Sequence, residues 1–267
     1  MNPTPHDSER KFHDAWASNT PLESRHVVAS FEATTAPEGR AIMRLIGDAR
    51  GKKILDVGCG LGEASAYFAL QGASVTAYDL SPKMVETTEA LAKKMGTSVR
   101  GVVGAAEKIA LEDNSFDFVY LGNLVHHVHE REGLWRQVHR LLKVGGKLIS
   151  WDPIKYNPVI NVYRAIATET RTPDERPLGR DDILEVKKVF NNVQYEMFWL
   201  SSLMIFIKYA LWNRYHPNRV RYWKKILEEP EKNVGWLRLL QAADHILLKI
   251  PGIRWLGWNI LISAEKK

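Results

Sequence analysis

Residues 54–62 read ILDVGCGLG: an apolar run passes directly into three closely spaced glycines, and a helix-forming segment follows. A strand, a glycine-rich turn and a helix in this order are typical of α/β folds that bind nucleotides at the turn. Glycine is needed there because the backbone bends tightly and a Cβ would block the approach of a ligand. The helix beyond the turn begins with unpaired N–H groups. The stretch therefore predicts a ligand site at the end of a buried strand.

Short apolar segments alternate with amphipathic ones around this stretch. The pattern predicts strands at 53–57, 74–78, 99–103, 116–121 and 146–151, and helices at 9–17, 24–32, 37–49, 63–71, 82–94 and 130–143. Such alternation indicates a parallel sheet, and β-branched apolar strands indicate burial on both faces. Ser81 before Pro82 marks a helix start, because serine caps a helix and proline fits its first turn.

After Trp151 the alternation breaks. A helix is expected at 180–190 and strands at 193–198 and 258–264, with an insertion between these two strands. We therefore divide the chain into an N-terminal helical segment that covers the ligand site, an α/β core, a helical insertion and a final core strand, at 1–50, 51–198, 199–257 and 258–267.

The composition is that of a folded globular chain, since 45% of the 267 residues are apolar and 25% are charged. The single cysteine, Cys59, excludes an internal disulfide framework and fits a reducing, cytoplasmic compartment. The first forty residues are polar and contain no apolar signal-peptide core. A net charge of +6 favours an anionic partner, either nucleic acid or a membrane surface.

Two carboxylates flank the glycine turn: Asp56 precedes it, and Asp79 ends the next strand. Glu63 stands where a dinucleotide-binding turn has its third glycine, and a buried Asp56 would repel a pyrophosphate but attract an ammonium or sulfonium group. Asp79 is placed to accept both hydroxyl hydrogens of a ribose. A glycine turn without a ligand, and a helix-capping role for Asp79, are the alternatives that the residues leave open.

The chain resembles the class I S-adenosylmethionine (SAM)-dependent methyltransferases, and most of all the group that includes the ubiquinone and menaquinone methyltransferases. Four stretches carry the resemblance: ILDVGCGLG at 54–62, VTAYDLSPKMV at 75–85, GAAEKIALEDNSFDFVYLGNLVHHV at 104–128 and LLKVGGKLIS at 141–150. It implies a Rossmann-like, seven-stranded sheet that is mostly parallel, with an antiparallel last strand. It also implies SAM as cofactor and S-adenosylhomocysteine as product.

The resemblance implies a role for each matching residue. Asp56 would face the methionine amino group, and Asp79 would hold the ribose hydroxyls. Leu80 would pack on the adenine face, and the Ala106 backbone N–H would bind the adenine ring. Asn123 would lie near the methionyl end. The implied cofactor site comprises Asp56, Gly58, Cys59, Gly60, Asp79, Leu80, Ala106, Glu107 and Asn123.

One position departs from the family pattern. Family members commonly read G-D-A-E where this chain has G-A-A-E, with Ala105 in place of an acid that accepts a hydrogen bond from the adenine amino group. The loss of one hydrogen bond weakens binding by about 1 kcal/mol. Glu107 is the candidate substitute.

Methyl transfer is an in-line displacement, so alignment supplies much of the rate, and a base is needed only where the acceptor must lose a proton. We predict that His127, after the fourth strand, is the general base or orients the acceptor; the alternative is that it only lines the pocket. A metal site from His126, His127 and His129 is not expected, because spacings of one and two residues suit ligation poorly. The residues expected to border the acceptor pocket are Trp151, Asp152, Pro153, Tyr156 and Asn157.

The insertion is rich in tryptophan and in basic residues. Residues 199–258 hold six of the nine tryptophans, and ten lysines and arginines against four acids. The run 197–212 is nearly all apolar, too short for a membrane span but suited to a helix that lies in the membrane interface. Residues 236–251 have a similar composition. The alternative is a helical lid that packs on the core without touching a membrane.

The expected function is methyl transfer from SAM to a hydrophobic small molecule or a lipid-like acceptor, with membrane contact through 199–257. One alternative is an RNA methyltransferase, because basic and aromatic residues also suit nucleic acid. The aromatic residues lie within long aliphatic runs, however, which favours lipid. A second alternative, a non-catalytic SAM-binding protein, draws support from Ala105. The sequence leaves open the acceptor, the atom methylated and the oligomeric state.

Overall fold

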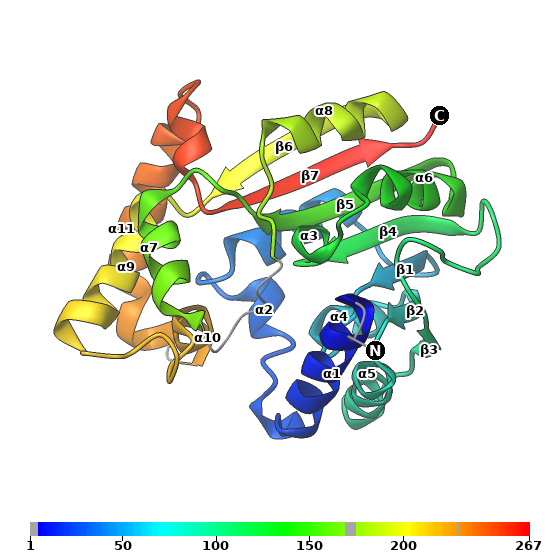
Figure 1. Cartoon of the computed structure of the whole chain (residues 1–267), viewed down its shortest axis with the longest axis horizontal. Coiled ribbons are helices and arrows are strands. Elements are labelled where there is room, and N and C mark those ends of the chain that lie inside the picture. Colours follow the sequence, from blue (N-terminus) through cyan, green and yellow to red (C-terminus); the bar gives the residue numbers. More distant parts are fainter. Residues whose placement is uncertain (1–4, 169–174, 229) are drawn as a thin grey trace.

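The computed structural model describes residues 5–168, 175–228 and 230–267. Its centre is a seven-stranded sheet in the order β3–β2–β1–β4–β5–β7–β6 (Figure 1). β7 runs antiparallel to both of its neighbours, and the other strand pairs are parallel. The expected Rossmann-like sheet with a reversed last strand is confirmed. The strands are β1 (Lys53–Val57), β2 (Ser74–Asp79), β3 (Arg100–Val103), β4 (Phe116–Gly122), β5 (Leu142–Pro153), β6 (Asn191–Phe198) and β7 (Asn259–Glu265).

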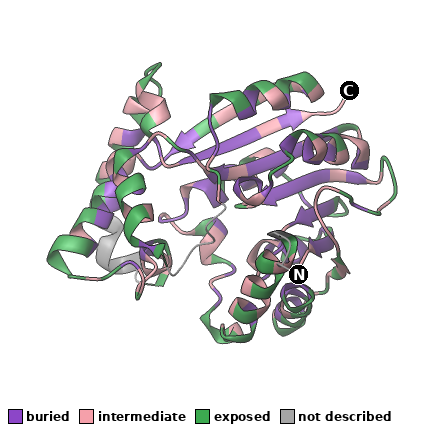
Figure 2. Cartoon of the chain, in the orientation of Figure 1, coloured by how far each residue is buried: buried purple, intermediate pink, exposed green. Residues whose placement is uncertain are grey.

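The sheet is covered on both faces because alternate residues of its strands pack into different cores. In β1, Ile54 joins one core, and Leu55 and Val57 join the other; all three are fully buried. The first core includes α3 (Pro37–Ile46) and α4 (Glu63–Leu70), and the second includes α6 (Arg131–Leu141) and α8 (Arg180–Val189). Figure 2 shows buried strands between helices whose outer surfaces are exposed. Burial of both faces stabilises the parallel strands and explains their continuous apolar runs.

Helix α5 (Pro82–Lys94) has the bounds that the sequence predicts. Ser81 Oγ accepts a hydrogen bond from the Met84 backbone N–H at 3.0 Å, and the proline occupies the first position. Strand β5, in contrast, starts at Leu142, four residues earlier than predicted. The glycines at 145 and 146 suggest a turn, but they lie in the strand, beside a register shift against β4 between Phe116 and Phe118.

The N-terminal segment packs on the core. Helix α1 (Pro5–Ser18) lies along α5 (Figure 1), and Asp14 accepts a hydrogen bond from Ser81 Oγ at 2.5 Å. The helix expected over 24–32 is wrong: a 3₁₀ turn, η1 (Leu22–Ser24), and the short α2 (Ala29–Glu32) flank an extended Arg25. The extended backbone directs the Arg25 side chain to α4, where it pairs with Glu63.

The insertion between β6 and β7 is helical, but a single helix over 197–212 is wrong, because helical structure begins only at Ser201. Met197 and Phe198 belong to β6, and Trp199, with a left-handed φ of 63°, ends the strand. The next apolar side chains, among them Ile205 and Phe206, are buried in the core. Within the described residues, no helix combines the length and apolarity of a membrane span. The remaining elements are α7 (Pro158–Ile166), η4 (Ser201–Leu203), α9 (Met204–Ile207), η5 (Lys208–Trp212), α10 (Tyr222–Glu228), α11 (Pro230–Leu247) and η6 (Ile253–Leu256).

A buried carboxylate joins the two ends of this insertion. Asp244 of α11 is 4% exposed and accepts hydrogen bonds from the backbone N–H groups of Leu200 and Ser201, at 3.1 and 2.5 Å. The Ser202 hydroxyl also donates to it. A carboxylate that accepts several N–H and O–H groups fixes their positions. Asp244 therefore holds α11 against the chain that leaves β6.

Candidate active site

A cavity of about 530 Å³ opens at the carboxyl ends of β1, β2 and β4. Ligands of open α/β sheets bind at this edge. Every residue that the sequence singled out for the cofactor or for catalysis lines this cavity: Asp56, Gly58, Cys59, Gly60, Asp79, Leu80, Ala106, Glu107, Asn123 and His127.

The glycine turn is tied to the neighbouring strand. The N–H groups of Gly58 and Cys59 both donate to the carbonyl of Tyr78, at 2.7 and 3.1 Å. Gly58 has a left-handed φ of 74°, and a Cβ there would lie 2.8 Å from the Leu124 side chain. Gly60 also has a left-handed φ, of 54°, but a Cβ there would meet open space. Gly58 is thus required by both conformation and packing, whereas Gly60 is required by conformation and leaves room beside the backbone.

Asp56 is almost completely buried beneath the turn. It accepts a hydrogen bond from the Ser65 hydroxyl at 2.6 Å. Burial, with a contribution from the charge of Asp79, raises the pKa of Asp56 to about 7. A buried carboxylate without a cation nearby is costly. The site therefore favours a ligand that brings a positive charge.

Asp79 holds the other side of the turn. One carboxylate oxygen accepts from the Gly60 N–H at 3.0 Å, and the other accepts from the Ser81 N–H at 2.9 Å. Burial raises the pKa of Asp79. Each oxygen keeps a lone pair beyond these backbone contacts, so the carboxylate has capacity for two ligand hydroxyl groups. The sequence also left open that Asp79 caps the helix that follows. Its contact with the backbone N–H of Ser81, which precedes α5, is part of such a role.

Arg25 is a site residue that the sequence analysis missed. Its side chain is 1% exposed, lines the cavity and donates to Glu63 at 2.9 Å. Its Nε–H finds no hydrogen-bond acceptor among the described residues. A buried donor without an acceptor is costly, so it suits an anionic group in the cavity. No sequence pattern marks this arginine, because only the fold brings it to the glycine turn.

The adenine end predicted from the family resemblance is partly closed by α1. Glu107 lies 3.4 Å from the His6 imidazole. The Ala105 carbonyl accepts a hydrogen bond from the Tyr78 hydroxyl at 3.2 Å. Asn123 adopts a left-handed φ of 54°, which asparagine tolerates better than most residues, and its N–H donates to the Trp151 carbonyl at 2.9 Å.

Two histidines each contact a carboxylate through Nδ1. His126 Nδ1 lies 2.8 Å from Asp152, which is fully buried and also accepts the His126 backbone N–H. His127 Nδ1 lies 3.0 Å from Glu9 of α1. Burial opposes the ionisation of Glu9, but hydrogen bonds from His127 and His13 outweigh it and hold the pKa of Glu9 well below its usual range. Each carboxylate fixes the orientation of its imidazole.

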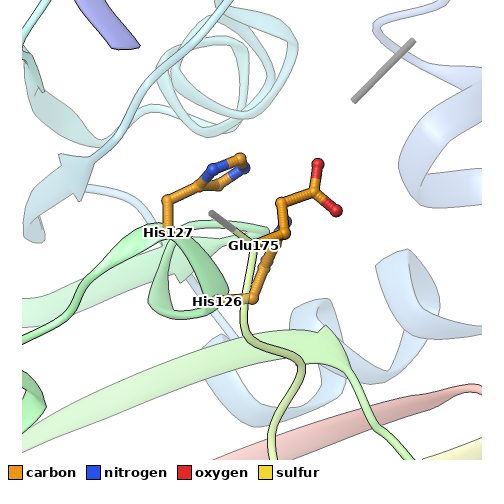
Figure 3. Close-up of side chains that lie close together, drawn as sticks. All are labelled: His126, His127 and Glu175. Carbon is orange, nitrogen blue, oxygen red and sulfur yellow. The ribbon is translucent and has the colours of Figure 1, made fainter. Parts of the chain in front are cut away.

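His126, His127 and Glu175 come together at the cavity wall (Figure 3), with one ligand atom of each within 4.8 Å of the others. The third member of this cluster is Glu175, whereas the metal site considered from the sequence had His129 in that place. Nitrogen ligands that share a zinc ion lie about 3.4 Å apart. Both histidines already engage carboxylates. In this arrangement the cluster is suited to proton transfer and would hold a metal only after the side chains moved closer.

The acceptor side of the cavity also differs from expectation. Trp151 and Pro153 line the cavity, as predicted. Asp152 lies behind His126, where burial raises its pKa to about 7. Tyr156 and Asn157 are not cavity residues: Tyr156 packs against Trp255, and Asn157 caps α7. Both follow β5 in sequence, but the chain has already turned away from the cavity.

The fold and the site define a Rossmann-like α/β protein with a glycine turn between two carboxylates, the buried Asp56 and the half-buried Asp79. Residues 55–150 match the methyltransferase domain family, which confirms the resemblance found in the sequence. The matched stretch runs from β1 to β5 and contains the glycine turn.

Individual relatives agree with this assignment. The chain is 33% identical over 120 residues to a ubiquinone biosynthesis O-methyltransferase of Pseudomonas syringae pv. tomato, covering 45% of this chain and 51% of the relative. It is 37% identical over 136 residues to a demethylmenaquinone methyltransferase of Chlorobaculum parvum, covering 50% of this chain and 51% of the relative. The chain thus spans about half the length of these curated relatives.

A solved structure extends the likeness in fold to nearly the whole chain. The [4+2]-cyclase SpnF superposes with a TM-score of 0.58 and 18% identity, over 99% of this chain and 97% of that one. At this identity the comparison shows the fold alone. Since that neighbour is a cyclase, the shared fold by itself does not define the reaction that this chain catalyses.

We expect S-adenosylhomocysteine to bind more weakly as the pH falls, because protonation of Asp56 removes the charge that attracts its ammonium group. With the pKa of Asp56 at about 7, linkage predicts about tenfold weaker binding at pH 6 than at pH 8. Isothermal titration calorimetry measures both affinities. Asp56→Asn should bind weakly at both values and lose the dependence. Equal affinity of the unsubstituted protein at the two pH values would contradict the role of Asp56.

Proposed function

We propose that this chain is a SAM-dependent methyltransferase whose acceptor has a large apolar body. The observation that carries the proposal is the placement of three charges around one glycine turn: the buried Asp56 and Arg25, and the half-buried Asp79. They match the ammonium, diol and carboxylate groups of one amino-acid nucleoside. A dinucleotide has no ammonium group for Asp56 and places a pyrophosphate against it.

The residues present fit SAM group by group. Asp56 binds the ammonium group, and the unpartnered Nε–H of Arg25 meets the carboxylate. Asp79 retains acceptor capacity for the ribose hydroxyls. Gly60 leaves open space for the methionyl chain, with Cys59 and Asn123 nearby. Leu80, Ala106 and Glu107 border the adenine. When bound, SAM supplies an electrophilic methyl group.

The rest of the cavity is walled by aromatic and aliphatic side chains. Trp151 and Tyr120 meet there, with the indole N–H donating to the Tyr120 hydroxyl at 2.6 Å. Such a chamber suits a hydrophobic ring or chain. The names of both curated relatives refer to quinones, which supports an acceptor of similar character. The apolar wall consists of Ile42, Tyr120, Trp151, Ile160, Tyr163, Trp199, Trp223, Ile226, Leu227 and Trp258.

His127 acts as general base toward the acceptor. Glu9 holds Nδ1 of the ring and favours the tautomer in which Nε2 accepts a proton. Because α1 supplies Glu9, the base is completed only when the N-terminal segment covers the core. The cavity walls align the acceptor, and alignment accounts for much of the rate of an in-line transfer. Glu9 is a positioning residue in this scheme.

The insertion serves as the lid and contacts a membrane surface. Of the large apolar side chains exposed in the described residues, most lie in this segment, and Trp212 and Leu211 are 85% and 70% exposed. Exposed apolar side chains in a segment rich in basic residues suit an anionic lipid interface. The exposed apolar residues are Met204, Ile207, Leu211, Trp212, Trp223, Trp236, Leu239, Ile246, Ile250 and Leu256.

Vesicle flotation tests the membrane contact. The protein should float with phosphatidylglycerol vesicles and less with neutral phosphatidylcholine ones. Trp212→Ser with Leu211→Ser should reduce the floated fraction severalfold, because both lose exposed apolar area. Leu184→Ser, at a 57% exposed position of α8, is the matched control and should leave flotation unchanged. An identical floated fraction for all variants would refute the contact through the insertion.

Transfer of label from methyl-tritiated SAM tests the proposed function against its two alternatives. The protein is incubated with labelled SAM and either a solvent extract of bacterial membranes or total RNA. We expect label in the organic phase. Label found in the RNA alone would show that the protein is an RNA methyltransferase. Binding of SAM without transfer to either fraction would favour the non-catalytic alternative.

The role of His127 is tested with the acceptor found in this way. His127→Ala should lower kcat at least a hundredfold and leave the Kd for S-adenosylhomocysteine within twofold, since a base contributes to the chemical step. Glu9→Gln should lower kcat less than His127→Ala does, because the ring remains and only the carboxylate that orients it is lost. Glu112→Gln, at an exposed position, is the control. An unchanged kcat in His127→Ala would remove the base from the mechanism.

A further inference from the structure

Two cations of the insertion line the same cavity as the cofactor residues: Arg221, just before α10, and Lys224 within it. The Arg221 guanidinium lies 4.3 Å from the centre of the Trp16 ring, which belongs to α1. The Lys224 ammonium lies 5.6 Å from the same ring and 5.6 Å from the ring of Trp223. Aromatic rings attract cations and fix their positions. The two positive charges are thus held side by side where the insertion meets the N-terminal helix.

The acids near these two cations act on them through charge, Glu175 on Arg221, and Glu63 and Glu228 on Lys224. Arg221 and Lys224 form no ion pair or side-chain hydrogen bond with any residue that the structure describes. Arg25, another cation of the cavity wall, pairs with Glu63. Lys225, adjacent to Lys224, pairs with Glu228. Arg221 and Lys224 therefore face the cavity without an ion pair, in contrast to these two neighbours.

We infer that Arg221 and Lys224 form a subsite for an anionic head group, a phosphate or a carboxylate, on the acceptor. The inference rests on the proposed function and narrows it: the acceptor is an amphiphile whose acidic head lies between these two cations and whose apolar body enters the aromatic chamber. Trp223, Ile226 and Leu227 of α10 lie close to the cations in sequence and line that chamber. The short segment 221–227 thus presents both the charged and the apolar part of the subsite.

The electrostatics of the empty cavity agree with this geometry. Burial lowers the pKa of Lys224 to about 8, and the charges of Arg25 and Arg221 add to the effect. The charges of Glu63 and Glu228 raise the pKa of Lys224, but by less than the other effects lower it. Burial likewise lowers the pKa of Arg221. Two cations that repel one another in a half-buried site gain when an anion enters. Binding of an anion should therefore weaken as the pH rises through about 8.

The carboxylate of SAM does not account for this pair. Arg25 lies at the glycine turn and has an unused Nε–H for a carboxylate. Glu63 pairs with Arg25, and Glu175, another acid of the cavity wall, acts on Arg221 through its charge. Arg221 and Lys224 thus lie apart from the group that binds the SAM carboxylate, and they can bind a second anion.

Calorimetric titration of the full chain with dodecyl phosphate, below its micelle concentration, tests the subsite with and without S-adenosylhomocysteine. Dodecyl phosphate should bind at least tenfold more tightly at pH 7 than dodecyltrimethylammonium or inorganic phosphate. Arg221→Gln and Lys224→Gln should each weaken its binding about tenfold and leave the affinity for S-adenosylhomocysteine within twofold. The matched controls, Arg238→Gln and Lys188→Gln, remove exposed charges and should change neither affinity.

Three results would overturn the inference. Equal binding of the cationic and anionic amphiphiles would show that charge plays no part. Inorganic phosphate that binds as tightly as dodecyl phosphate would show a site for a small free anion. Loss of S-adenosylhomocysteine affinity in Arg221→Gln and Lys224→Gln would assign the pair to the cofactor. Failure of S-adenosylhomocysteine to bind the unsubstituted protein would refute the proposed function alone, because dodecyl phosphate is also titrated in its absence.

Discussion

The contact between the glycine turn and the carbonyl of Tyr78 is the constraint on which the site depends. Two N–H groups, of Gly58 and Cys59, converge on this one oxygen and fix the turn to β2. Because β1 and β2 are parallel neighbours, Asp56 and Asp79 then come to the same edge of the sheet, on either side of the turn. A side chain at position 58 would collide with Leu124 and open this contact. The backbone, more than any single side chain, thus sets the distance between the two carboxylates.

The cavity is closed by segments that come from both ends of the chain. Helix α1 contributes Glu9 and Trp16; α10 contributes Lys224, and the residue just before it is Arg221. These helices meet through the contact of Arg221 with Trp16, and Asp244 holds the insertion to the end of β6. The core alone would present an open groove. Its two coverings give the cavity a charged mouth and an apolar interior, which together favour an amphiphilic acceptor.

The distribution of charge within the cavity separates the cofactor side from the acceptor side. Two carboxylates, Asp56 and Asp79, surround the glycine turn, whereas two half-buried cations without an ion pair lie at the insertion. Charges that are shielded from water cost stability, so their persistence at one site is typical of ligand binding. Under the proposed function, the opposite signs at the two sides orient a cationic cofactor and an anionic acceptor relative to one another. The histidines lie at the wall of the same cavity.

The sequence by itself determined the sheet, the glycine turn and the two carboxylates, because these follow from local patterns: apolar runs, glycine spacing and the residue that ends each strand. It also placed His127 at the cavity. The positions of Glu9, Arg25, Glu175, Arg221 and Lys224 were decided only by the tertiary structure, since each belongs to a covering segment with no periodic pattern of its own. The run 197–212 is nearly all apolar, and this composition alone suggested one helix. Pairing of its first residues with β7 and burial of the next ones against the core overrode that local preference.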